Sequence, residues 1–523
     1  TQGILTGTSF TLNPGSGVTV SVSANLAGAV NLTHSGVGTA NLSGYNAYSG
    51  TTTLNTSGGI LAITGSGSLS GTSAGVYSGA IAIGSGATFK YSSSATQTLQ
   101  TGVISGAGNL TKDTDASSVL TLTGSNTYSG VTTINAGTLS VGTIGDGGVA
   151  GNLGQATNSA SNLVLGGGTL QYTGSTASTD RNFTITAGTT GTFDITTNTL
   201  TISGSAAATS GNLTKTGSGI LILTGTNLQT GIVTLNAGTL SVGAIGNGGS
   251  TSSNLSASSN ANTNLVLGNG TLIYTGAGET SDRAFTITAG TTATIDNSAT
   301  LTLAGSTVTA TTGALTKTNS GTLNLTGVNT YTGTTTISAG TFAITGSGSL
   351  NSGSYAGAIV NNGAFNYLSS ATQTLSGIIS GSGTLTKDTG SSSVLTLSNA
   401  SNSYSGITTI SAGTIAISAD ANLGTASTLV PTQLTLSGGI LQTTASFTLA
   451  TNRGITLSTG GGTINVNSGI TTIYGGTISG TTIFTKDGLG TFVLSGDSAV
   501  DGQFIIVNKK ASEDASLVVQ SGK

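Results

Sequence analysis

The sequence of 523 residues contains no cysteine, methionine or tryptophan, a single histidine and only two prolines. Without cysteine the chain cannot form disulfides or use a thiol as a nucleophile. Lysine, arginine, aspartate and glutamate together make up 5% of the residues. Because catalysis needs several acid–base or nucleophilic groups in one place, this composition points away from an enzyme before any motif is considered.

Charge and hydropathy exclude two further classes of protein. The 12 basic residues are outnumbered by 15 acidic ones, which gives a formal net charge of −3 and no source for the positive stripe that nucleic acids require. No apolar run approaches the roughly 20 residues that a membrane-spanning helix needs. We therefore expect no nucleic-acid partner and no transmembrane segment.

Glycine, by contrast, is abundant at 85 residues. Such a composition can belong to a flexible linker, but here leucine, isoleucine and valine recur at regular intervals and indicate an ordered core. Because the composition is the same from end to end, we expect one elongated unit rather than several different domains.

A short phrase recurs along the chain. Four copies read Leu-Thr-Lys, a fifth reads Phe-Thr-Lys and a sixth reads Leu-Thr-His; they end at Lys112, Lys215, Lys317, Lys387, Lys486 and His34. The spacers between them repeat as well, since SATQTL begins at Ser94 and Ser370, and NLVLG begins at Asn162 and Asn264. Duplication of multi-coil blocks explains both observations.

Within a copy, apolar and polar residues alternate over very short stretches. Alternation with a period of two predicts strands, and three short strands joined by turns form a coil of roughly 20 residues that stacks on the next coil. The sequence thus predicts an all-β fold, a right-handed parallel β-helix (β-solenoid), as one elongated rod about 110 to 130 Å long. An antiparallel sandwich is the alternative. The leucines expected to point inward are Leu120, Leu122, Leu323, Leu325, Leu395 and Leu397.

The chain divides by pattern into three parts. Residues 1–29 form a strand-rich cap or assembly segment, residues 30–490 carry the solenoid repeats, and residues 491–523 hold a degenerate last repeat with a cap or assembly tail.

The segment LTKTNSGTLNLTGVNTYTGTTTISAGTFAITG (Leu315–Gly346) resembles the autotransporter-associated β-strand repeat of bacterial passenger domains. TDRNFTITAGTTGTFDI (Thr179–Ile195) is similar to the companion segment found between such repeats. The resemblance covers most of the chain. It implies a right-handed β-helical passenger, secreted or displayed on a Gram-negative bacterium, of the kind found in adhesins and surface-layer proteins.

The repeated lysines are interpreted as solvated residues at the edges of turns, because a catalytic site must exist once and not five times. Three of them precede an aspartate, at Asp113, Asp388 and Asp487. His34 fills the same slot and is expected at the surface, without partners for a metal. Replacing the lysines by glutamine should then leave stability nearly unchanged.

Three arginines occupy matching places in the long spacers: Arg181, Arg283 and Arg453, which follow Asp180, Asp282 and Asn452. An arginine can span a turn and donate to several carbonyl groups, and we favour that structural role over ligand binding.

The turn NTYSG and its variants place an asparagine and a tyrosine at equivalent positions of successive repeats, and we call these positions the asparagine slot and the tyrosine slot. The asparagines are Asn46, Asn126, Asn227, Asn329 and Asn402; the tyrosines are Tyr48, Tyr128, Tyr331 and Tyr404, with Gln229 once. Asparagine suits left-handed turn conformations and bonds its own backbone. The tyrosines are expected to cover local turns, and an aromatic row that contacts a glycan is the alternative.

No constellation for chemistry emerges. The 15 acidic residues are scattered, and the Gly-rich turns lack the repeated aspartate of calcium-binding β-helices. We expect no catalytic residues, no cofactor and no metal.

The two ends of a solenoid leave strands unpaired, and this predicts an assembly interface. Its expected residues are Ile4, Leu5, Phe10, Val18, Val20, Phe504, Ile505, Ile506, Val507, Leu517, Val518 and Val519. We therefore expect an extracellular structural protein that assembles head to tail with copies of itself into a filament or layer. The alternative is a singly displayed adhesin passenger, with glycans or proteins of host or neighbouring cells as partners.

Overall fold

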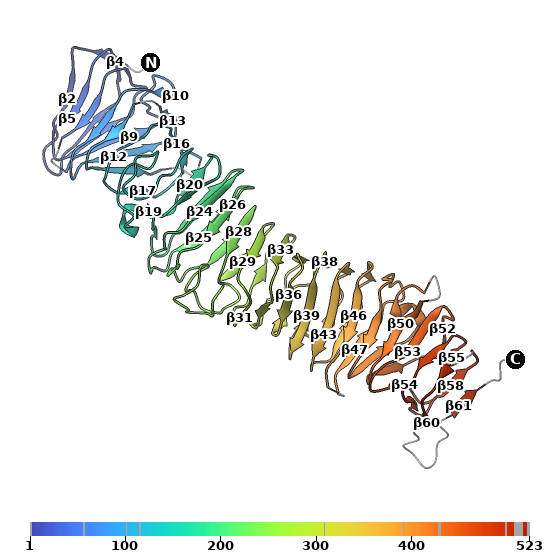
Figure 1. Ribbon diagram of the computed structural model, residues 1–523. Helices are drawn as coiled ribbons and strands as arrows, with labels where there is room; N and C mark the ends of the chain where they lie inside the picture. Colours follow the sequence, from blue (N-terminus) through green and yellow to red (C-terminus); the bar gives the residue numbers. More distant parts are fainter. Residues whose placement is uncertain are drawn as a thin grey trace. The chain divides into compact units, whose positions relative to one another are not determined.

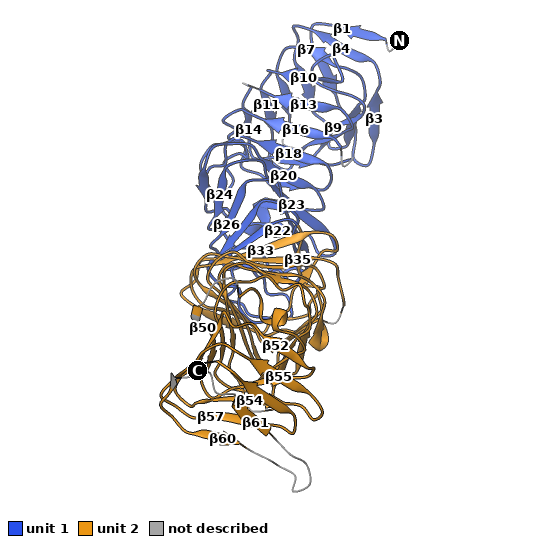
Figure 2. Cartoon of the chain, turned by 90° about the vertical axis from the view of Figure 1, so that its right-hand side faces the viewer, with its two compact units in different colours: residues 1–259, 269–273 blue, residues 260–268, 274–523 orange. Residues whose placement is uncertain are grey.

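The structure is a computed structural model that describes residues 3–55, 58–100, 102–114, 117–307, 309–390, 392–426, 430–496, 499–506 and 516–519. The chain forms two compact units (Figure 2). Unit 1 comprises residues 1–259 and 269–273, and unit 2 comprises residues 260–268 and 274–523.

Both units are parallel β-solenoids, as the sequence predicts (Figure 1). Within the described residues, every pairing between named strands is parallel, and each strand pairs with one from the next coil, for example Leu120 with Leu139 and Leu139 with Leu170. Parallel pairing between successive coils rules out the antiparallel sandwich. Antiparallel contact within the described ranges is confined to an isolated bridge between Asn126 and Gly151.

The strands of unit 1 form five stacks, and within each stack neighbouring strands are hydrogen-bonded. The first contains β1 (Ile4–Thr6), β4 (Asn25–Gly28) and β7 (Ala47–Tyr48). The second contains β2 (Phe10–Leu12), β5 (Leu32–His34), β8 (Thr52–Leu54), β11 (Ile81–Ile83) and β14 (Ile104–Ser105). The third contains β3 (Thr19–Val22), β6 (Thr39–Leu42), β9 (Ile60–Gly65), β12 (Thr88–Ser93), β15 (Asn109–Lys112), β17 (Thr132–Ile134), β19 (Leu163–Leu165) and β22 (Thr184–Ile185). The fourth contains β10 (Ala74–Tyr77), β13 (Thr96–Leu99), β16 (Val119–Leu122), β18 (Thr138–Val141), β20 (Thr169–Tyr172), β23 (Thr190–Ile195), β25 (Asn212–Thr216) and β27 (Val233–Leu235). The fifth contains β21 (Ala177–Thr179), β24 (Thr199–Ile202), β26 (Ile220–Leu223) and β28 (Thr239–Val242).

Unit 2 repeats this arrangement. One long stack contains β31 (Glu279–Ser281), β34 (Leu301–Leu303), β36 (Thr322–Leu325), β39 (Thr341–Gly346), β43 (Ala364–Ser369), β46 (Thr384–Lys387), β48 (Thr408–Ile410), β50 (Val430–Leu436), β53 (Arg453–Leu457), β56 (Ile478–Gly480) and β59 (Ala499–Val500). Another contains β41 (Ser354–Tyr355), β44 (Gln373–Leu375), β47 (Val394–Leu397), β49 (Thr414–Ile417), β51 (Ile440–Thr443), β54 (Gly462–Val466), β57 (Phe484–Asp487) and β60 (Phe504–Ile506). A third contains β33 (Thr292–Asn297), β35 (Ala314–Thr318), β38 (Thr335–Ile337), β42 (Ile359–Asn361) and β45 (Ile379–Ser380). The shorter stacks are β52 (Phe447–Leu449), β55 (Thr471–Tyr474), β58 (Thr491–Leu494) and β61 (Ser516–Val519); β29 (Leu265–Leu267) with β32 (Thr286–Ile287); and β37 (Val328–Asn329) with β40 (Ser349–Leu350). Strand β30 (Thr271–Tyr274) lies where the two units divide.

The core of each unit is a set of apolar ladders that run from coil to coil. The six leucines expected to point inward are all fully buried, which confirms that part of the prediction. In unit 1 one ladder runs through Leu120, Leu139, Leu170 and Phe193. In unit 2 the rings of Phe342 and Phe365 stack with centroids 6.1 Å apart. Burial of these side chains, with about 25 cal/mol per Å² of apolar area, is the main stabilising contribution.

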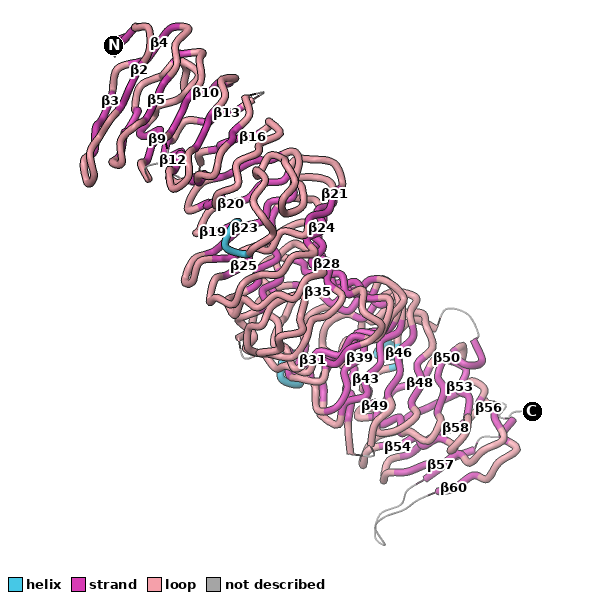
Figure 3. Tube along the Cα trace, turned by 60° about the vertical axis from the view of Figure 1, so that its left-hand side comes forward, coloured by secondary structure: helices cyan, strands magenta, loops and turns pink. Residues whose placement is uncertain are grey.

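Loops and short strands alternate along both units, and three single turns of 3-10 helix, η1 (Ala160–Asn162), η2 (Asn351–Gly353) and η3 (Asp420–Leu423), interrupt them (Figure 3). No helix within the described ranges has the length and apolar character needed to cross a bilayer.

Candidate functional site: the repeated polar slots

The lysines of the repeated phrase lie inside the solenoid, so the expectation of solvated turn lysines is wrong. Lys112, Lys215, Lys317, Lys387 and Lys486 are each 0–1% exposed. The reason is the period of the strand: in Leu-Thr-Lys the lysine follows the leucine by two residues and faces the same side. Each lysine therefore joins an apolar ladder, as Lys317 does between Ile295 and Ile337 of the neighbouring coils.

Each lysine ammonium donates hydrogen bonds to backbone carbonyl oxygens, and we call the carbonyl groups around one ammonium its cage. The Nζ of Lys215 donates to the carbonyl oxygens of Thr216, of Gly217 at 2.9 Å and of Ala237 at 3.4 Å. Two of these oxygens belong to the turn that follows the lysine, and the third belongs to the next coil. Lys112 does the same with Thr114 at 2.9 Å and Ala136 at 3.3 Å. The lysine thus joins two successive coils through its side chain.

The Ala-Gly turn of the next coil completes this cage. Gly238 has φ +66°, and a Cβ built on it would lie 2.9 Å from Nζ of Lys215 and 2.2 Å from the carbonyl oxygen of Gly217. Gly413, with φ +70°, lies in the same way against Lys387. A side chain at either glycine would enter the space of the ammonium, so the repeated lysine and the repeated glycine depend on each other.

Burial changes the acid–base properties of these lysines. It lowers the pKa of Lys215, Lys317 and Lys387 to about 8 each, against a smaller opposing effect from the carboxylates of Asp194, Asp296 and Asp388. All five ammonium groups donate to carbonyl oxygens of the turn that follows the lysine, and those of Lys112 and Lys215 also donate to the next coil, so these two lysines link neighbouring coils.

His34 is also buried, which corrects the expectation of a surface histidine. It occupies the inward position of β5, is 1% exposed, and pairs in register with Leu12 and Leu54. Its Nε2 has no hydrogen-bond partner. Desolvation by burial lowers its pKa below the usual value of 6.5. His34 thus differs from the lysines in chemistry while sharing their place in the fold.

Two of the arginines, Arg181 and Arg453, span turns, as predicted. Arg181 is buried and donates from Nε to the carbonyl oxygen of Gly145 at 2.8 Å and from an Nη to that of Gly154 at 2.7 Å. Arg453 donates to the carbonyl oxygen of Gly424 at 2.8 Å and forms an ion pair with Asp420 at 2.9 Å. Arg283 is equally buried, and desolvation lowers its pKa.

The asparagine slot tethers three coils, which the sequence reasoning missed. The Oδ1 of Asn126 accepts from the backbone N–H of Ile104 in the preceding coil at 2.9 Å, and its Nδ2 donates to the carbonyl oxygen of Asn152 in the following coil at 2.9 Å. Asn402 makes the same two contacts, to Ile379 and Asn422. None of the five asparagines has a positive φ, so the left-handed conformation expected for them is wrong. The bond to their own backbone is seen at Asn46, whose Nδ2 donates to Gly44.

The tyrosine slot is buried as well. Tyr48, Tyr128, Tyr331 and Tyr404 are at most 4% exposed, and each hydroxyl hydrogen-bonds to the Oγ1 of the threonine four residues later, at 2.7 to 3.0 Å. Gln229, at the equivalent place, donates to the carbonyl oxygen of Leu255 at 3.1 Å. These side chains cover their local turns, and an aromatic row open to a glycan does not form.

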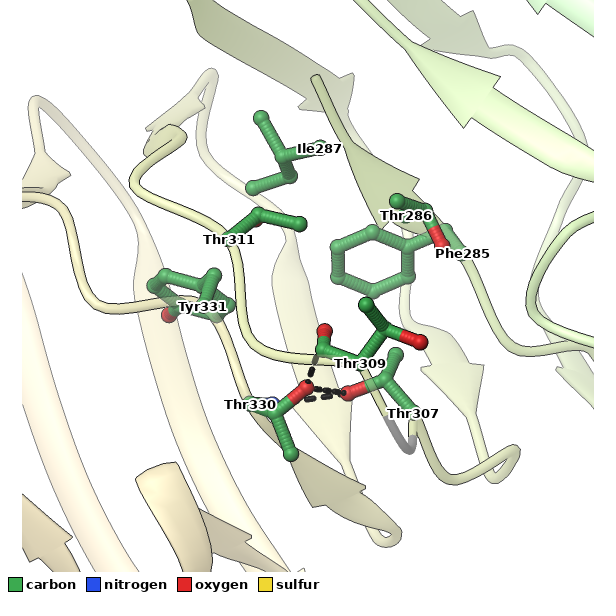
Figure 4. Close-up of a pocket in the computed structure, with 8 residues that line it drawn as sticks. All are labelled: Phe285, Thr286, Ile287, Thr307, Thr309, Thr311, Thr330 and Tyr331. Carbon is green, nitrogen blue, oxygen red and sulfur yellow. Dashed lines mark hydrogen bonds between the residues drawn. The ribbon is translucent and has the colours of Figure 1, made fainter. Parts of the chain in front are cut away.

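A cavity of about 10 Å³ in unit 2 lies among Phe285, Thr286, Ile287, Thr307, Thr309, Thr311, Thr330 and Tyr331 (Figure 4). The Oγ1 of Thr330 hydrogen-bonds to that of Thr307 at 2.8 Å and donates to the carbonyl oxygen of Thr309 at 2.7 Å. A space of this size holds about one water molecule, and no ionisable group other than the phenol of Tyr331 lines it. It is a packing gap and provides no reaction chamber.

An outward groove of about 530 Å³ lies across β6, β9 and β12 of unit 1 and the turn that follows β15. Hydroxyl and amide side chains line it together with Ile60, Ala62 and Gly65. Lys90 and Asp113 also line it and form an ion pair of 2.5 Å, and both side chains are about one third exposed. We call this surface the Lys90 groove.

The described residues among those expected at the ends lie on or beside strands that have one described partner strand each. Strands β1, β2 and β3 pair with β4, β5 and β6, and β60 and β61 pair with β57 and β58. Apolar side chains are exposed there: Ile4, Leu5, Val18, Val20, Phe504, Ile505, Ile506, Val518 and Val519. Phe10 and Leu517 are half-buried. Val507 lies outside the described residues.

Over the described ranges, no three histidine, cysteine or acidic side chains gather in a way that could hold a metal ion.

Two comparisons with known proteins found matches to this chain. The passenger-associated-transport repeat is matched six times, at residues 32–63, 117–141, 213–242, 315–344, 389–417 and 484–506. The chain is also similar to the adhesin BmaC autotransporter of Brucella suis biovar 1 (strain 1330), with 34% identity over an alignment of 581 residues. The alignment covers 80% of this chain. The aligned region spans 17% of the length of that relative.

Proposed function

We propose that this chain, which carries six passenger-associated-transport repeats, acts as the passenger of a bacterial surface protein and works by adhesion rather than by catalysis. The observation that carries the proposal is that the repeated lysine, asparagine and tyrosine side chains are buried within the coils. What remains for function is a rigid outer surface of short polar side chains. Similarity to an autotransporter adhesin supports this assignment and a place outside the cell.

The Lys90 groove is the surface that we propose for contact with a ligand. Its volume is within the range of ligand-binding clefts, and its hydroxyl, amide and charged groups can hydrogen-bond to a polar ligand such as a glycan or a peptide backbone. The stacked strands beneath it hold these groups in fixed places, which lowers the entropic cost of binding.

Unit 2 provides a natural comparison for the test. By register, Asn366 and Leu368 of β43 stand where Lys90 and Ser92 stand in β12. Purified wild-type chain and the double variant Lys90→Asn/Ser92→Leu would be applied to host-cell monolayers and to surfaces coated with extracellular-matrix glycoproteins. We expect the wild type to bind and the variant to lose at least tenfold in affinity, with an unchanged circular dichroism spectrum.

The control is the reverse pair, Asn366→Lys/Leu368→Ser, which leaves the Lys90 groove untouched and should bind as the wild type does. Equal binding by all three proteins would remove the groove from the proposal. Absence of binding to any cell or glycoprotein would contradict adhesion itself.

Head-to-tail association is a second candidate, favoured by the one-sided strands at both ends. Among the described residues, β1 and β60 each pair with one strand, and their exposed apolar side chains, such as Ile4 and Ile505, are suited to addition of a further parallel strand. Sedimentation of the chain at increasing concentration tests this candidate, with Ile4→Lys and Ile505→Lys as variants. Concentration-dependent growth that either variant abolishes would support a filament, whereas a monomer at all concentrations would exclude it.

A further inference from the structure

The distribution of basic side chains carries an inference beyond adhesion. Nine lysines and arginines lie in the described residues, and eight of them are at most 3% exposed: Lys112, Lys215, Lys317, Lys387, Lys486, Arg181, Arg283 and Arg453. Lys90 is the ninth, with about one third of its side chain exposed. The acidic residues in the described ranges, by contrast, are all half-buried or exposed.

We propose that the solenoid withholds its lysine and arginine side chains from proteases that cleave after basic residues, so that the described part of the folded chain offers them no usable site. Such proteases bind the basic side chain in a deep pocket with a carboxylate at its base. A lysine whose Nζ donates to backbone carbonyl groups inside the fold must leave that cage before it can enter the pocket.

This protection matters because the lysines lie next to exposed turns, where proteases cleave most readily. Exposed loop tips of small and polar residues are the preferred sites of proteolytic nicking. Lys317 is followed three residues later by Ser320, which is exposed in the turn, and Lys215 is followed in the same way by the exposed Ser218. With outward side chains, these lysines would place a basic cleavage site beside an accessible turn in each repeat.

Lys90 is protected in another way. It lies within β12, which pairs with β9 on one side and with β15 on the other. A protease needs an extended and unpaired segment, so the sheet shields the backbone at Lys90 although the side chain reaches solvent. The buried lysines and this strand together account for the lysines of the described part of unit 1.

The experiment is digestion of the folded chain with trypsin at pH 8, followed by mass spectrometry of the fragments. Residues 507–523 are analysed separately because Lys509, Lys510 and Lys523 fall there. We expect no cleavage after any of the eight buried basic residues while the far-ultraviolet circular dichroism spectrum is unchanged, and cleavage throughout after unfolding in urea.

Two variants separate side-chain burial from general rigidity. Ser320→Lys and Ser218→Lys place a lysine in the same turn as Lys317 and Lys215, but at an exposed position. We expect cleavage after each introduced lysine at least tenfold faster than after its buried neighbour. If the introduced lysines resist as well, rigidity of the backbone is the whole explanation and the proposal is wrong. Cleavage of the native chain at Lys215 or Lys317 at a comparable rate would also overturn it. Neither result depends on whether the chain is an adhesin.

Discussion

One block of sequence occurs once in each unit. The interior contacts of the two copies are alike, and the copies differ mainly in their outward-facing side chains. In unit 1 the hydroxyls of Tyr48 and Tyr77 both hydrogen-bond to Thr52 Oγ1, and in unit 2 those of Tyr331 and Tyr355 both hydrogen-bond to Thr335 Oγ1. The ring centroids are 5.7 Å apart in the first pair and 5.9 Å apart in the second. Likewise, Lys112 lies 5.9 Å from the ring centroid of Tyr91, and Lys387 lies 5.7 Å from that of Tyr367.

The exterior of the two copies is not alike. Lys90 and Ser92 of unit 1 correspond to Asn366 and Leu368 of unit 2, and the turn from Leu69 to Tyr77 is longer than its counterpart from Leu350 to Tyr355. One interior position also differs, since the slot of the first repeat holds the buried His34 in unit 1 and the buried Lys317 in unit 2. The shared interior contacts therefore define the coil, whereas the exterior side chains vary between the copies and are the candidates for contact with a ligand.

The largest effect is expected from a charge in the interior ladder. Leu323→Asp in β36 should destabilise its coils by about 4 kcal/mol or more, because an unpaired carboxylate would be buried between Leu301 and Phe342. Thermal melting and hydrogen exchange of β34 and β39 measure the loss. Asn324→Asp, one residue away on the outward side, is the control and should cost less than about 1 kcal/mol. Equal effects of both variants would contradict the register.

The second effect tests how much the cage around a buried lysine stabilises the fold. Lys317→Ala removes the methylene stem and leaves the carbonyl oxygens of Thr318 and Asn319 without this donor, so we expect a loss of about 3 kcal/mol. Lys317→Met keeps an apolar stem and should cost much less than Lys317→Ala, because burial disfavours the ammonium, as its lowered pKa indicates, and its net contribution to stability is small. Denaturant titration followed by fluorescence of the tyrosines gives both values. No loss in either variant would make the cage irrelevant to stability.

Exchanging His34 and Lys317 between the two copies tests whether each slot is adapted to its own residue. His34→Lys would replace an imidazole whose Nε2 lacks a partner by an ammonium that can donate to the turn. We expect unit 1 to gain about 1 kcal/mol and Lys317→His to cost unit 2 a similar amount. Melting curves of the two single variants and of the double exchange measure this. A loss in both single variants would show that each slot is adapted to its own residue.

The pH dependence of stability follows from the same slots. The pKa of Lys215, Lys317 and Lys387 is about 8 in the fold against 10.5 in the unfolded chain, so unfolding takes up protons between these values and stability should rise from pH 8 towards pH 10. Each unit of pKa shift corresponds to about 1.4 kcal/mol. The lowered pKa of His34 acts in the same sense, with stability falling as the pH drops below 6.5.

Buried tyrosines set the upper limit of the pH range in which stability rises. Burial raises the pKa of Tyr128, Tyr355 and Tyr404 to about 12, so above pH 10 the unfolded chain loses protons that the folded chain retains, and stability should fall. Urea midpoints measured from pH 5 to pH 11 test both limbs. Replacing all three lysines by methionine should remove the rise between pH 8 and pH 10 and leave the decline above it; an unaltered rise would assign it to other groups.

Much of this fold could be predicted from sequence, because alternation and internal duplication reflect the same geometry in every coil. The inward leucines and the parallel stacking follow directly from the period of two. That period also puts lysine on the leucine side in Leu-Thr-Lys, but the general preference of charged residues for solvent led to the opposite expectation. Burial is possible because backbone carbonyl groups accept hydrogen bonds from the ammonium, at Lys112 and Lys215 from two coils, and a sequence does not reveal such a cage.

The other repeated slots show the same limit. Tyrosine and threonine recur four residues apart, as in Tyr128 and Thr132, and this spacing was a visible signal for the hydroxyl pair. The cross-coil bonds of Asn126 had no such signal, because they depend on residues more than twenty positions away in both directions. The Lys90 groove could not be predicted at all, since it arises from residues of three separate strands and a turn.

The smallest effect on stability is expected where the two copies differ most. Lys90→Asn gives unit 1 the residue that unit 2 carries at the matching place of β43. The ion pair with Asp113 is partly exposed, and such pairs contribute less than about 1 kcal/mol, so the free energy of unfolding should change by no more than about 0.5 kcal/mol. Thermal melting at low and high salt measures this. Asp113→Asn is the matched control, since it removes the other partner of the same ion pair and should have an equally small effect. A loss above about 1 kcal/mol in either variant would mean that the ion pair serves the fold and is not available to a ligand. The proposed contact surface would then have to lie elsewhere on the exterior.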